Sequence, residues 1–216
     1  MQESIKAKKL RAEKIFKILK KEYPDAKSSL NYKNLFELFV VVPLSAQTTD
    51  INVNKVSKKL FQKIKNIHDL ANISQSELEE IIRSLGFFRQ KSKNLRNAAK
   101  MIISDFEGKI PDSMEDLIKL PGIARKTANI ILESGFNKVE GIAVDTHVKR
   151  ISKKLNLTEN ENPDKVEKDL KEVFLKSYWG EINHLMVFHG RKICTARKEK
   201  CEICSLFPYC PGRKII

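Results

Sequence analysis

Residues 120–129 read LPGIARKTAN, and this stretch predicts a helix, a tight turn and a second helix. Leu117 and Ile118 belong to an amphipathic segment before it, and Ile130 and Ile131 continue the helix after it. Proline and glycine let the chain turn sharply, which brings backbone N–H groups to a helix start where the helix dipole attracts phosphate. A Pro-Gly pair on its own favours an ordinary helix connection, so the turn needs support from other residues.

Helix signals occur along the rest of the chain, whereas no segment reads as a convincing strand. Residues 74–77 (SQSE) and 112–115 (DSME) have the spacing of a capping box, in which the first residue caps the helix. Asn162-Pro163 places an N-cap before a proline at the first helical position. Residues 166–174 and 182–189 carry apolar side chains at helical spacing. The predicted fold class is therefore all-α.

The charge balance indicates a polyanionic partner. The chain of 216 residues has 41 Lys and Arg against 27 Asp and Glu, a net charge of +14, which suits DNA, RNA or an acidic membrane face. Its longest apolar run, residues 39–44, is far shorter than the ~20 residues that span a bilayer. The N-terminus has no continuous apolar stretch of the kind found in signal peptides. Neither membrane insertion nor secretion is expected.

All four cysteines cluster near the C-terminus with the pattern C-x6-C-x2-C-x5-C, at Cys194, Cys201, Cys204 and Cys210. Two disulfides would require an oxidising compartment, which nothing in the sequence indicates. Zinc and a [4Fe–4S] cluster both bind four thiolates. A zinc ribbon usually has two C-x2-C pairs, whereas this loop has one with wider flanking gaps, and that spacing favours the iron–sulfur cluster.

Arg197, Lys198 and Lys200 lie between the first two cysteines. They can complement the negative charge of a thiolate-bound cluster or contact phosphate, although a basic run is also typical of a solvated surface. The net charge of the chain favours phosphate contact.

Lys126 and Asp145 are the candidate catalytic residues. Lys126 falls in the first turn of the second hairpin helix, where the positive helix end and Arg125 favour a neutral amine able to form a Schiff base. Considered alone, any one lysine in so basic a chain is more typical of a solvated surface. Asp145 follows an apolar run and precedes a helix, so it is placed to cap that helix. A carboxylate there could also stabilise a developing sugar cation.

Several motifs together carry a resemblance to a known family. LPGIARKTAN, AVDTH (residues 143–147) and the four-cysteine loop occur in one order with PLSAQTTD (43–50), NVNK (52–55) and FHGRKIC (188–194). In this set the sequence resembles the endonuclease III family of helix–hairpin–helix DNA glycosylases, from about residue 10 to residue 212.

The resemblance implies a two-lobed, all-α helix–hairpin–helix glycosylase fold. One lobe of six helices would span residues 28–139, and the other would combine residues 1–27 with 140–216, including the iron–sulfur loop 194–210. The implied partner is duplex DNA with a damaged base or an abasic site. A monomer in a prokaryotic cytoplasm, associated with the nucleoid, is expected.

The implied activity is that of a bifunctional DNA glycosylase and AP lyase acting on oxidised pyrimidines. Lys126 would attack C1′ of a damaged nucleotide flipped from the stack, and β-elimination from the resulting imine would cut the strand on the 3′ side. Asp145 would support the cationic transition state. The four cysteines match the [4Fe–4S] ligands, and the cluster would shape the basic loop.

Other positions match family DNA contacts. Gln47 would fill the gap left in the duplex, although it could simply be a polar residue in a helix connection. Phe87 lies where the family has an aliphatic wedge, although core packing is an equal interpretation. Arg89 would reach the opposite strand. The remaining candidates are Gly122, Ala124 and Arg125 in the hairpin and Arg197, Lys198 and Lys200 in the cysteine loop. Ala124 replaces a family glycine, which would cost about 1 kcal/mol if this position needs a positive φ.

Two other functions fit part of this pattern. An adenine-mismatch glycosylase of the same superfamily typically lacks the lysine and has a further C-terminal domain, whereas this chain has Lys126 and ends six residues after Cys210. A non-catalytic iron–sulfur DNA-binding protein would use the basic surface and thiolates but would not need Lys126 with Asp145.

Overall fold

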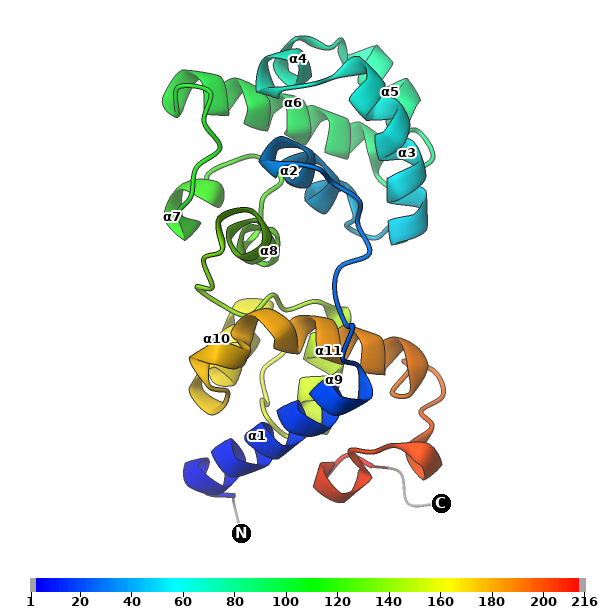
Figure 1. The fold of residues 1–216 in the computed structure, drawn as a ribbon, viewed down its shortest axis with the longest axis vertical. Helices are drawn as coiled ribbons and strands as arrows, with labels where there is room; N and C mark the ends of the chain where they lie inside the picture. Colours follow the sequence, from blue (N-terminus) through cyan, green and yellow to red (C-terminus); the bar gives the residue numbers. More distant parts are fainter. Residues whose placement is uncertain (1–2, 214–216) are drawn as a thin grey trace. The chain divides into compact units, whose positions relative to one another are not determined.

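The computed structural model describes residues 3–213 and is helical throughout, as the sequence predicts (Figure 1). This part of the chain contains eleven α-helices and three short 3₁₀ helices. Residues 3–213 include no β-strand, only an isolated bridge between Cys194 and Glu199. No helix in the same range is long and apolar enough to cross a membrane.

The helices follow one another with short connections. In chain order they are α1 (Ile5–Glu22), α2 (Leu35–Leu44), α3 (Asp50–Lys63), α4 (Ile67–Asn72), α5 (Gln75–Ile82), α6 (Phe88–Asp105), α7 (Met114–Leu117), α8 (Arg125–Phe136), α9 (Thr146–Lys154), α10 (Pro163–Val173), η1 (Lys176–Tyr178), α11 (Trp179–Lys192), η2 (Cys201–Ile203) and η3 (Phe207–Tyr209).

The chain divides into two compact units. The continuous unit is Ser29–Lys138, and the discontinuous unit joins the chain up to Ser28 with the chain from Val139 onward. Each unit has a hydrophobic core of its own. Each unit therefore has its own apolar driving force for folding.

The continuous unit is built around α2. Its residues Val40, Val41 and Val42 are almost completely buried, because α3, α6 and α8 all contact this helix. Helix α6 packs in turn against α4 and α5 (Figure 1). The longest apolar run of the sequence is thus the centre of a helical core, as expected for a helix that is hydrophobic all round.

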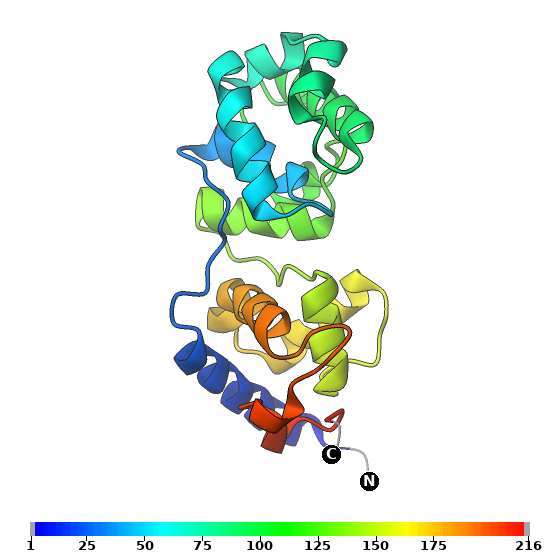
Figure 2. The same ribbon diagram turned by 90° about the vertical axis from the view of Figure 1, so that its right-hand side faces the viewer.

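The discontinuous unit brings the two ends of the chain together. Helix α1 packs against α10 and α11, and the ring of Phe16 stacks on that of Tyr178 with 3.7 Å between centroids. The guanidinium of Arg11 donates to the carbonyl oxygens of Leu155 (2.5 Å) and Tyr209 (3.1 Å). Figure 2 shows α1, in dark blue, beside the C-terminal segment in red. These contacts position the segment that carries the cysteines.

The helix caps test the start signals read from the sequence. Ser74 accepts from Glu77 N, and Asn162 accepts from the first turn of α10, as predicted. The prediction that Asp112 caps a helix is wrong by one residue, since Ser113 accepts from Asp116 N at 3.1 Å. The physical reason is that Asp112 pairs instead with Lys138, whose Nζ lies 2.5 Å from its carboxylate.

Candidate functional site

The hairpin turn depends on Gly122. This residue has φ +82°, a conformation that L side chains rarely adopt. A Cβ added there would lie 2.8 Å from Asn94 Nδ2 on α6, which is closer than real contacts allow. Both the backbone conformation and the space beside α6 therefore require glycine.

Ala124 occupies its position without strain. Its φ of −88° and ψ of 167° are those of extended backbone, so the glycine that the family has at this position is not needed for conformation here. Ala124 is the N-cap of α8 and provides no side-chain cap. Gly122 and Ala124 are both exposed, and Arg125 is half-buried. The start of α8 thus presents backbone N–H groups that no side chain caps, an arrangement that suits an anion.

Lys126 is the second residue of α8 and is half-buried. The first turn of this helix contains no acidic residue. The amine of Lys126 therefore extends from the positive end of a helix, directly after the tight turn.

Gln47 and Phe87 project from two loops of the continuous unit. Both have a left-handed backbone, with φ of 52° and 57°, and both side chains are exposed, that of Phe87 by 68%. The neighbouring Phe88 packs against the core, so the core-packing interpretation of Phe87 is wrong. Arg89 is exposed, and its guanidinium lies 4.8 Å from the centre of the Phe88 ring.

Residues of these two loops and of the hairpin turn line one pocket. It has a volume of about 180 Å³ and lies within the continuous unit. Its lining joins Gln47 and Phe87 to Pro121 and Gly122 of the hairpin. The amide side chains Gln90 and Asn94 of α6 fill the wall between them, joined by a 2.7 Å hydrogen bond from Gln90 Nε2 to Asn94 Oδ1.

Lys91, which also lines this pocket, was missed by the sequence analysis. It is 9% exposed, and its ammonium donates to Leu44 O (2.9 Å), Ala46 O (2.7 Å) and Thr48 Oγ1 (2.9 Å). A signal was available in the sequence, because Lys91 falls on the buried stripe of α6 with Leu95 and Ile102. A lysine on an apolar stripe must bury its ammonium, so it indicates that polar partners from another part of the chain lie nearby.

Asp145 caps α9, as predicted. Its backbone is extended, and its Oδ1 accepts from Val148 N at 2.8 Å. The segment before it, residues 142–144, is buried, and Asn183 Nδ2 donates to Ala143 O at 2.5 Å. This packing fixes the direction from which the half-buried carboxylate of Asp145 is presented.

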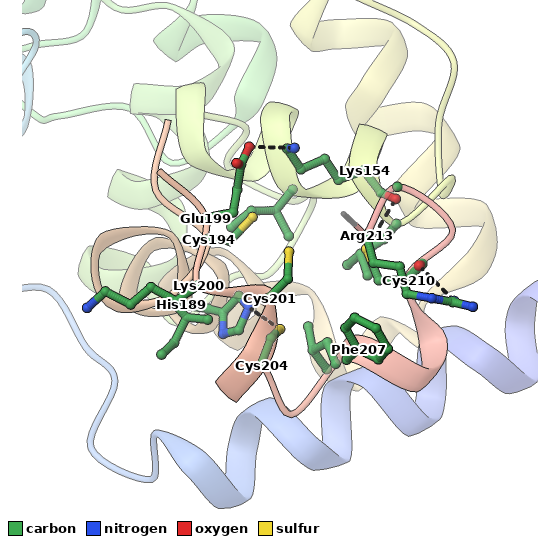
Figure 3. Close-up of a pocket in the computed structure, with 15 residues that line it drawn as sticks. Lys154, His189, Cys194, Glu199, Lys200, Cys201, Cys204, Phe207, Cys210 and Arg213 are labelled. Carbon is green, nitrogen blue, oxygen red and sulfur yellow. Dashed lines mark hydrogen bonds and ion pairs between the residues drawn. The ribbon is translucent and has the colours of Figure 1, made fainter. Parts of the chain in front are cut away.

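The four cysteines line one pocket of the discontinuous unit (Figure 3). All four are free and partly buried, and the apolar residues Ile151, Leu155 and Leu206 line the same pocket. Cys204 Sγ lies 3.5 Å from His189 Nε2, and Cys210 Sγ lies 3.5 Å from Lys154 O. Within residues 3–213, no three His, Cys, Asp or Glu side chains are grouped tightly enough to hold a single metal ion.

This donor set fits an iron–sulfur cluster. Burial raises the pKa of the Cys194 and Cys210 thiols and raises that of Cys204 to about 11. Buried thiolates therefore need positive charge nearby, which cluster iron supplies. The pocket also has basic side chains in its wall, among them Lys154 and Arg213.

In the loop between the first two cysteines, the basic side chains face solvent and the acidic side chain faces inward. Arg197, Lys198 and Lys200 are exposed. Glu199 turns inward instead, is 9% exposed, and pairs with Lys154 at 2.7 Å (Figure 3). The loop therefore offers three cations to solvent without exposing its one carboxylate.

Comparison with known proteins defines the class. Residues 40–176 match the model of the HhH-GPD superfamily of base excision DNA repair proteins, and residues 194–210 match the iron–sulfur binding domain of endonuclease III. The first match covers the hairpin and Asp145, and the second begins and ends on a cysteine of the loop. The fold and the site are those of a helix–hairpin–helix base-excision repair protein with an iron–sulfur domain.

Full-length relatives narrow the class to one family. The chain is 45% identical to endonuclease III of Synechocystis sp. over 95% of this chain and 94% of that one, and 42% identical to endonuclease III of Bacillus subtilis over 87% and 86%. A solved trapped endonuclease III–DNA covalent intermediate, an estranged-adenine complex, superposes with a TM-score of 0.90 at 40% identity, covering 94% of this chain and 96% of that one.

The chain belongs to the endonuclease III family. It is a bifunctional DNA glycosylase and AP lyase of base excision repair, and its cofactor is a [4Fe–4S] cluster.

Proposed function

We propose that the enzyme removes oxidised pyrimidines from duplex DNA and that Lys126 is its nucleophile. The observation that carries the proposal is the position of Lys126, half-buried in the first turn of α8 immediately after the hairpin. The first turn of α8 contains no acidic residue that could pair with this amine. The similarity to a trapped covalent endonuclease III–DNA intermediate also supports a covalent mechanism.

The chemistry follows from an amine attacking a sugar carbon. The Lys126 amine bonds to C1′ as the bond from C1′ to the base breaks, and the base leaves with the bonding electrons and takes up a proton. Opening of the sugar ring gives an imine between Lys126 and C1′. Loss of a proton from C2′ then expels the 3′ phosphate by β-elimination, and water releases the lysine from the imine. Atoms and electrons balance without an oxidant or a reductant.

Asp145 is proposed to stabilise the cationic sugar as the base departs. A carboxylate near a developing positive charge lowers the barrier electrostatically and can also assist proton transfer. Its Oδ1 is used to cap α9, which holds the side chain in one orientation. Capping and catalysis are therefore compatible at this residue.

The DNA contacts are proposed to fall into two groups. Gln47 and Phe87 enter the duplex where the damaged nucleotide leaves it, and Arg89 lies beside them to reach the opposite strand. The hairpin, through Gly122, Ala124 and Arg125, and the cysteine loop, through Arg197, Lys198 and Lys200, contact phosphates. Exposure of the two loop side chains and of the three loop cations supports these assignments.

Cys194, Cys201, Cys204 and Cys210 are the proposed cluster ligands. The cluster supplies a rigid cross-link between these positions when bound, and base excision itself transfers no net electrons. What this chain contributes is the loop geometry, in which Glu199 is held inward by Lys154 and the basic residues point to solvent.

At the level of the whole protein, we propose two domains, residues 28–139 and residues 1–27 with 140–216. The two compact units with separate cores support this division. A monomer in a prokaryotic cytoplasm, associated with the nucleoid, fits an enzyme whose substrate is chromosomal DNA.

A lesion panel tests the substrate class. Single-turnover excision is measured on one duplex context carrying thymine glycol, dihydrouracil, uracil, 3-methyladenine, or adenine opposite 8-oxoguanine. The proposal expects the first two substrates to react at least tenfold faster than the others. Preferred excision of adenine opposite 8-oxoguanine would instead assign the chain to the mismatch branch.

A further inference from the structure

The two exposed loop residues of the continuous unit share an unusual backbone conformation. Gln47 and Phe87 are both non-glycine residues with positive φ, which costs free energy and persists only where the surrounding structure enforces it. Neither residue caps a helix with its side chain, and neither side chain is buried. Something behind these loops must therefore hold their backbones.

Lys91 is the residue behind both loops. Its ammonium has three donors, and three oxygens of the Gln47 loop receive them, from Leu44, Ala46 and Thr48. Two of these acceptors flank Gln47 directly in sequence. The backbone N–H of Lys91 meanwhile donates to Phe87 O at 3.0 Å. That bond is the first i to i−4 bond of α6, so the helical turn that begins at Phe87 places the Lys91 side chain against the Gln47 loop.

The charge of Lys91 is balanced by backbone dipoles. Leu44 is the last residue of α2, so its carbonyl belongs to the negative end of that helix. No ion pair of Lys91 occurs among residues 3–213, and burial lowers the pKa of its amine. A buried cation without a carboxylate partner is costly, so its retention here suits a specific task.

The two loops lie close to each other. A Cβ added to Gly86 would lie 3.4 Å from Gln47 O, so the space between the two backbones would just hold one more carbon atom. Asn52 Nδ2 donates to Ser84 O at 3.0 Å, which ties the start of α3 to the loop before Phe87. We therefore expect a shift of one loop to disturb the other.

We propose that Lys91 is a positioning residue that locks Gln47 and Phe87 into one rigid wedge, so that both side chains enter the duplex together. The inference rests on the proposed function, in which these two side chains contact DNA. Lys91 itself touches neither substrate nor the reacting atoms. Its effect is confined to the step in which the damaged base leaves the stack, and the Lys126 chemistry that follows does not depend on it.

The test compares Lys91→Met with Lys100→Met in the cluster-containing protein. Lys100 lies toward the other end of α6 and is exposed, so both variants lose one charge from the same helix. Two steps are measured: single-turnover excision of thymine glycol, and borohydride trapping on DNA with a preformed abasic site. Because a displaced contact residue costs one to two orders of magnitude in rate, Lys91→Met should slow excision at least about tenfold and trapping less than about threefold. Lys100→Met should match the wild type in both.

A spectroscopic readout separates positioning from a general structural role. The probe is a duplex with a tetrahydrofuran abasic analogue next to 2-aminopurine, whose fluorescence increases when the wedge unstacks it. Lys91→Met should lose most of this increase at saturating protein while its circular dichroism spectrum stays that of the wild type. In a Gln47→Ala background, Lys91→Met should slow excision by less than about twofold more, because residues acting through one another are not additive.

Alternative outcomes are distinguishable. Wild-type excision and unstacking in a folded Lys91→Met protein would overturn the inference and leave the proposed function intact. Failure of the wild type itself to excise or unstack would overturn the proposed function. If Lys91→Met does not fold, Thr48→Val removes one acceptor with Lys91 in place, and it should slow excision and reduce unstacking in the same direction. A Thr48→Val protein identical to the wild type would then refute the proposal.

Discussion

Two separate constraints require glycine at position 122: its positive φ and the lack of room for a Cβ. Its φ is +82°, and a Cβ there would overlap Asn94, whereas Gly108 has a similar φ of +75° with its nearest neighbour 3.5 Å from such a Cβ. Both glycines lie in the continuous unit. The pair therefore separates the conformational cost from the steric one.

Gly122→Ala should destabilise the protein more than Gly108→Ala. We expect a loss of about 1 kcal/mol at Gly108 from the left-handed conformation alone, and about 2 to 4 kcal/mol at Gly122, where overpacking adds to it. Denaturant unfolding measures both, and DNA affinity should fall only for Gly122→Ala. Equal destabilisation by the two variants would mean that Asn94 moves aside freely.

The role of a residue was predictable from the sequence where a motif specifies it. It was not predictable where the role depends on contacts made by the fold. The Pro-Gly turn and the position of Lys126 in the first turn of the second helix follow from local rules and are found in the structure. Whether Phe87 packs in the core or projects from it could not be decided from the sequence, because that depends on which way the backbone turns. The stripe of α6 marks Lys91 as unusual, but its bonding partners lie more than forty positions away and no local pattern identifies them.

At the scale of elements, Asp145 caps α9 and also carries a negative charge, and two substitutions can test these roles separately. Asparagine caps a helix about as well as aspartate but has no charge, whereas alanine does neither. Asp145→Asn should keep thermal stability and lose most base excision. Asp145→Ala should lose excision and also about 1 kcal/mol of stability, because Val148 N loses its acceptor. Thermal unfolding and single-turnover excision measure the two effects, and normal excision by Asp145→Asn would contradict the proposed role.

Arg11 of α1 forms a bidentate ion pair with Glu3, which precedes the helix, and also bonds to two carbonyl oxygens elsewhere in the unit. Arg11 donates from Nε and Nη2 to the Glu3 carboxylate at 2.9 and 2.7 Å while it also contacts Leu155 O and Tyr209 O. The hydrogen bond from Arg11 holds the pKa of Glu3 below its ordinary value of 4.5. A carboxyl group with a lowered pKa stabilises the fold above its unfolded pKa, and this contribution disappears as pH falls through the folded pKa.

Glu3→Gln should therefore reduce stability by about 1 kcal/mol at pH 7, with the difference from wild type shrinking as pH falls below 4.5. Glu13→Gln is the control, because Glu13 pairs with Lys17 on the exposed face of the same helix. The control should change stability by no more than about 0.5 kcal/mol. A pH-independent deficit in Glu3→Gln would show that packing, not charge, holds α1 in place.

Element starts illustrate how far local rules extend. Ser74, Asp145 and Asn162 cap the helices that the sequence predicts, because each side chain reaches N–H groups of its own first turn. The cap at residue 112 was misplaced because Lys138, distant in sequence, competes for the Asp112 carboxylate. Tertiary ion pairs of this kind override a capping pattern.

At the scale of the whole molecule, the two units have separate cores. We therefore expect loss of the cluster to affect the discontinuous unit more than the continuous one. Cys194, Cys204 and Cys210 pack at the edge of the core of the discontinuous unit, and no cysteine belongs to the other core. Removal of iron with a chelator should release hydrogen-exchange protection in residues 194–213 and leave that of α2, α6 and α8 intact. At the same DNA concentration, the iron-depleted protein should also bind duplex DNA more weakly than the untreated protein. Loss of protection throughout Ser29–Lys138 would contradict independent cores.

The all-α class was predictable because helix periodicity is a local property of the chain. The assembly of two cores from a discontinuous sequence was suggested only by the family resemblance, since contacts such as that of Arg11 with Tyr209 join residues almost two hundred positions apart. Periodicity says which face is apolar, and not which partner covers it.

Borohydride trapping on abasic duplex DNA tests the central claim most directly. Wild type, Lys126→Gln and Lys149→Gln are compared, the last being a half-buried lysine of α9 that pairs with Glu161. We predict a covalent protein–DNA adduct for the wild type and Lys149→Gln, and none for Lys126→Gln, with DNA binding largely retained. An undiminished adduct in Lys126→Gln would show that another amine is the nucleophile.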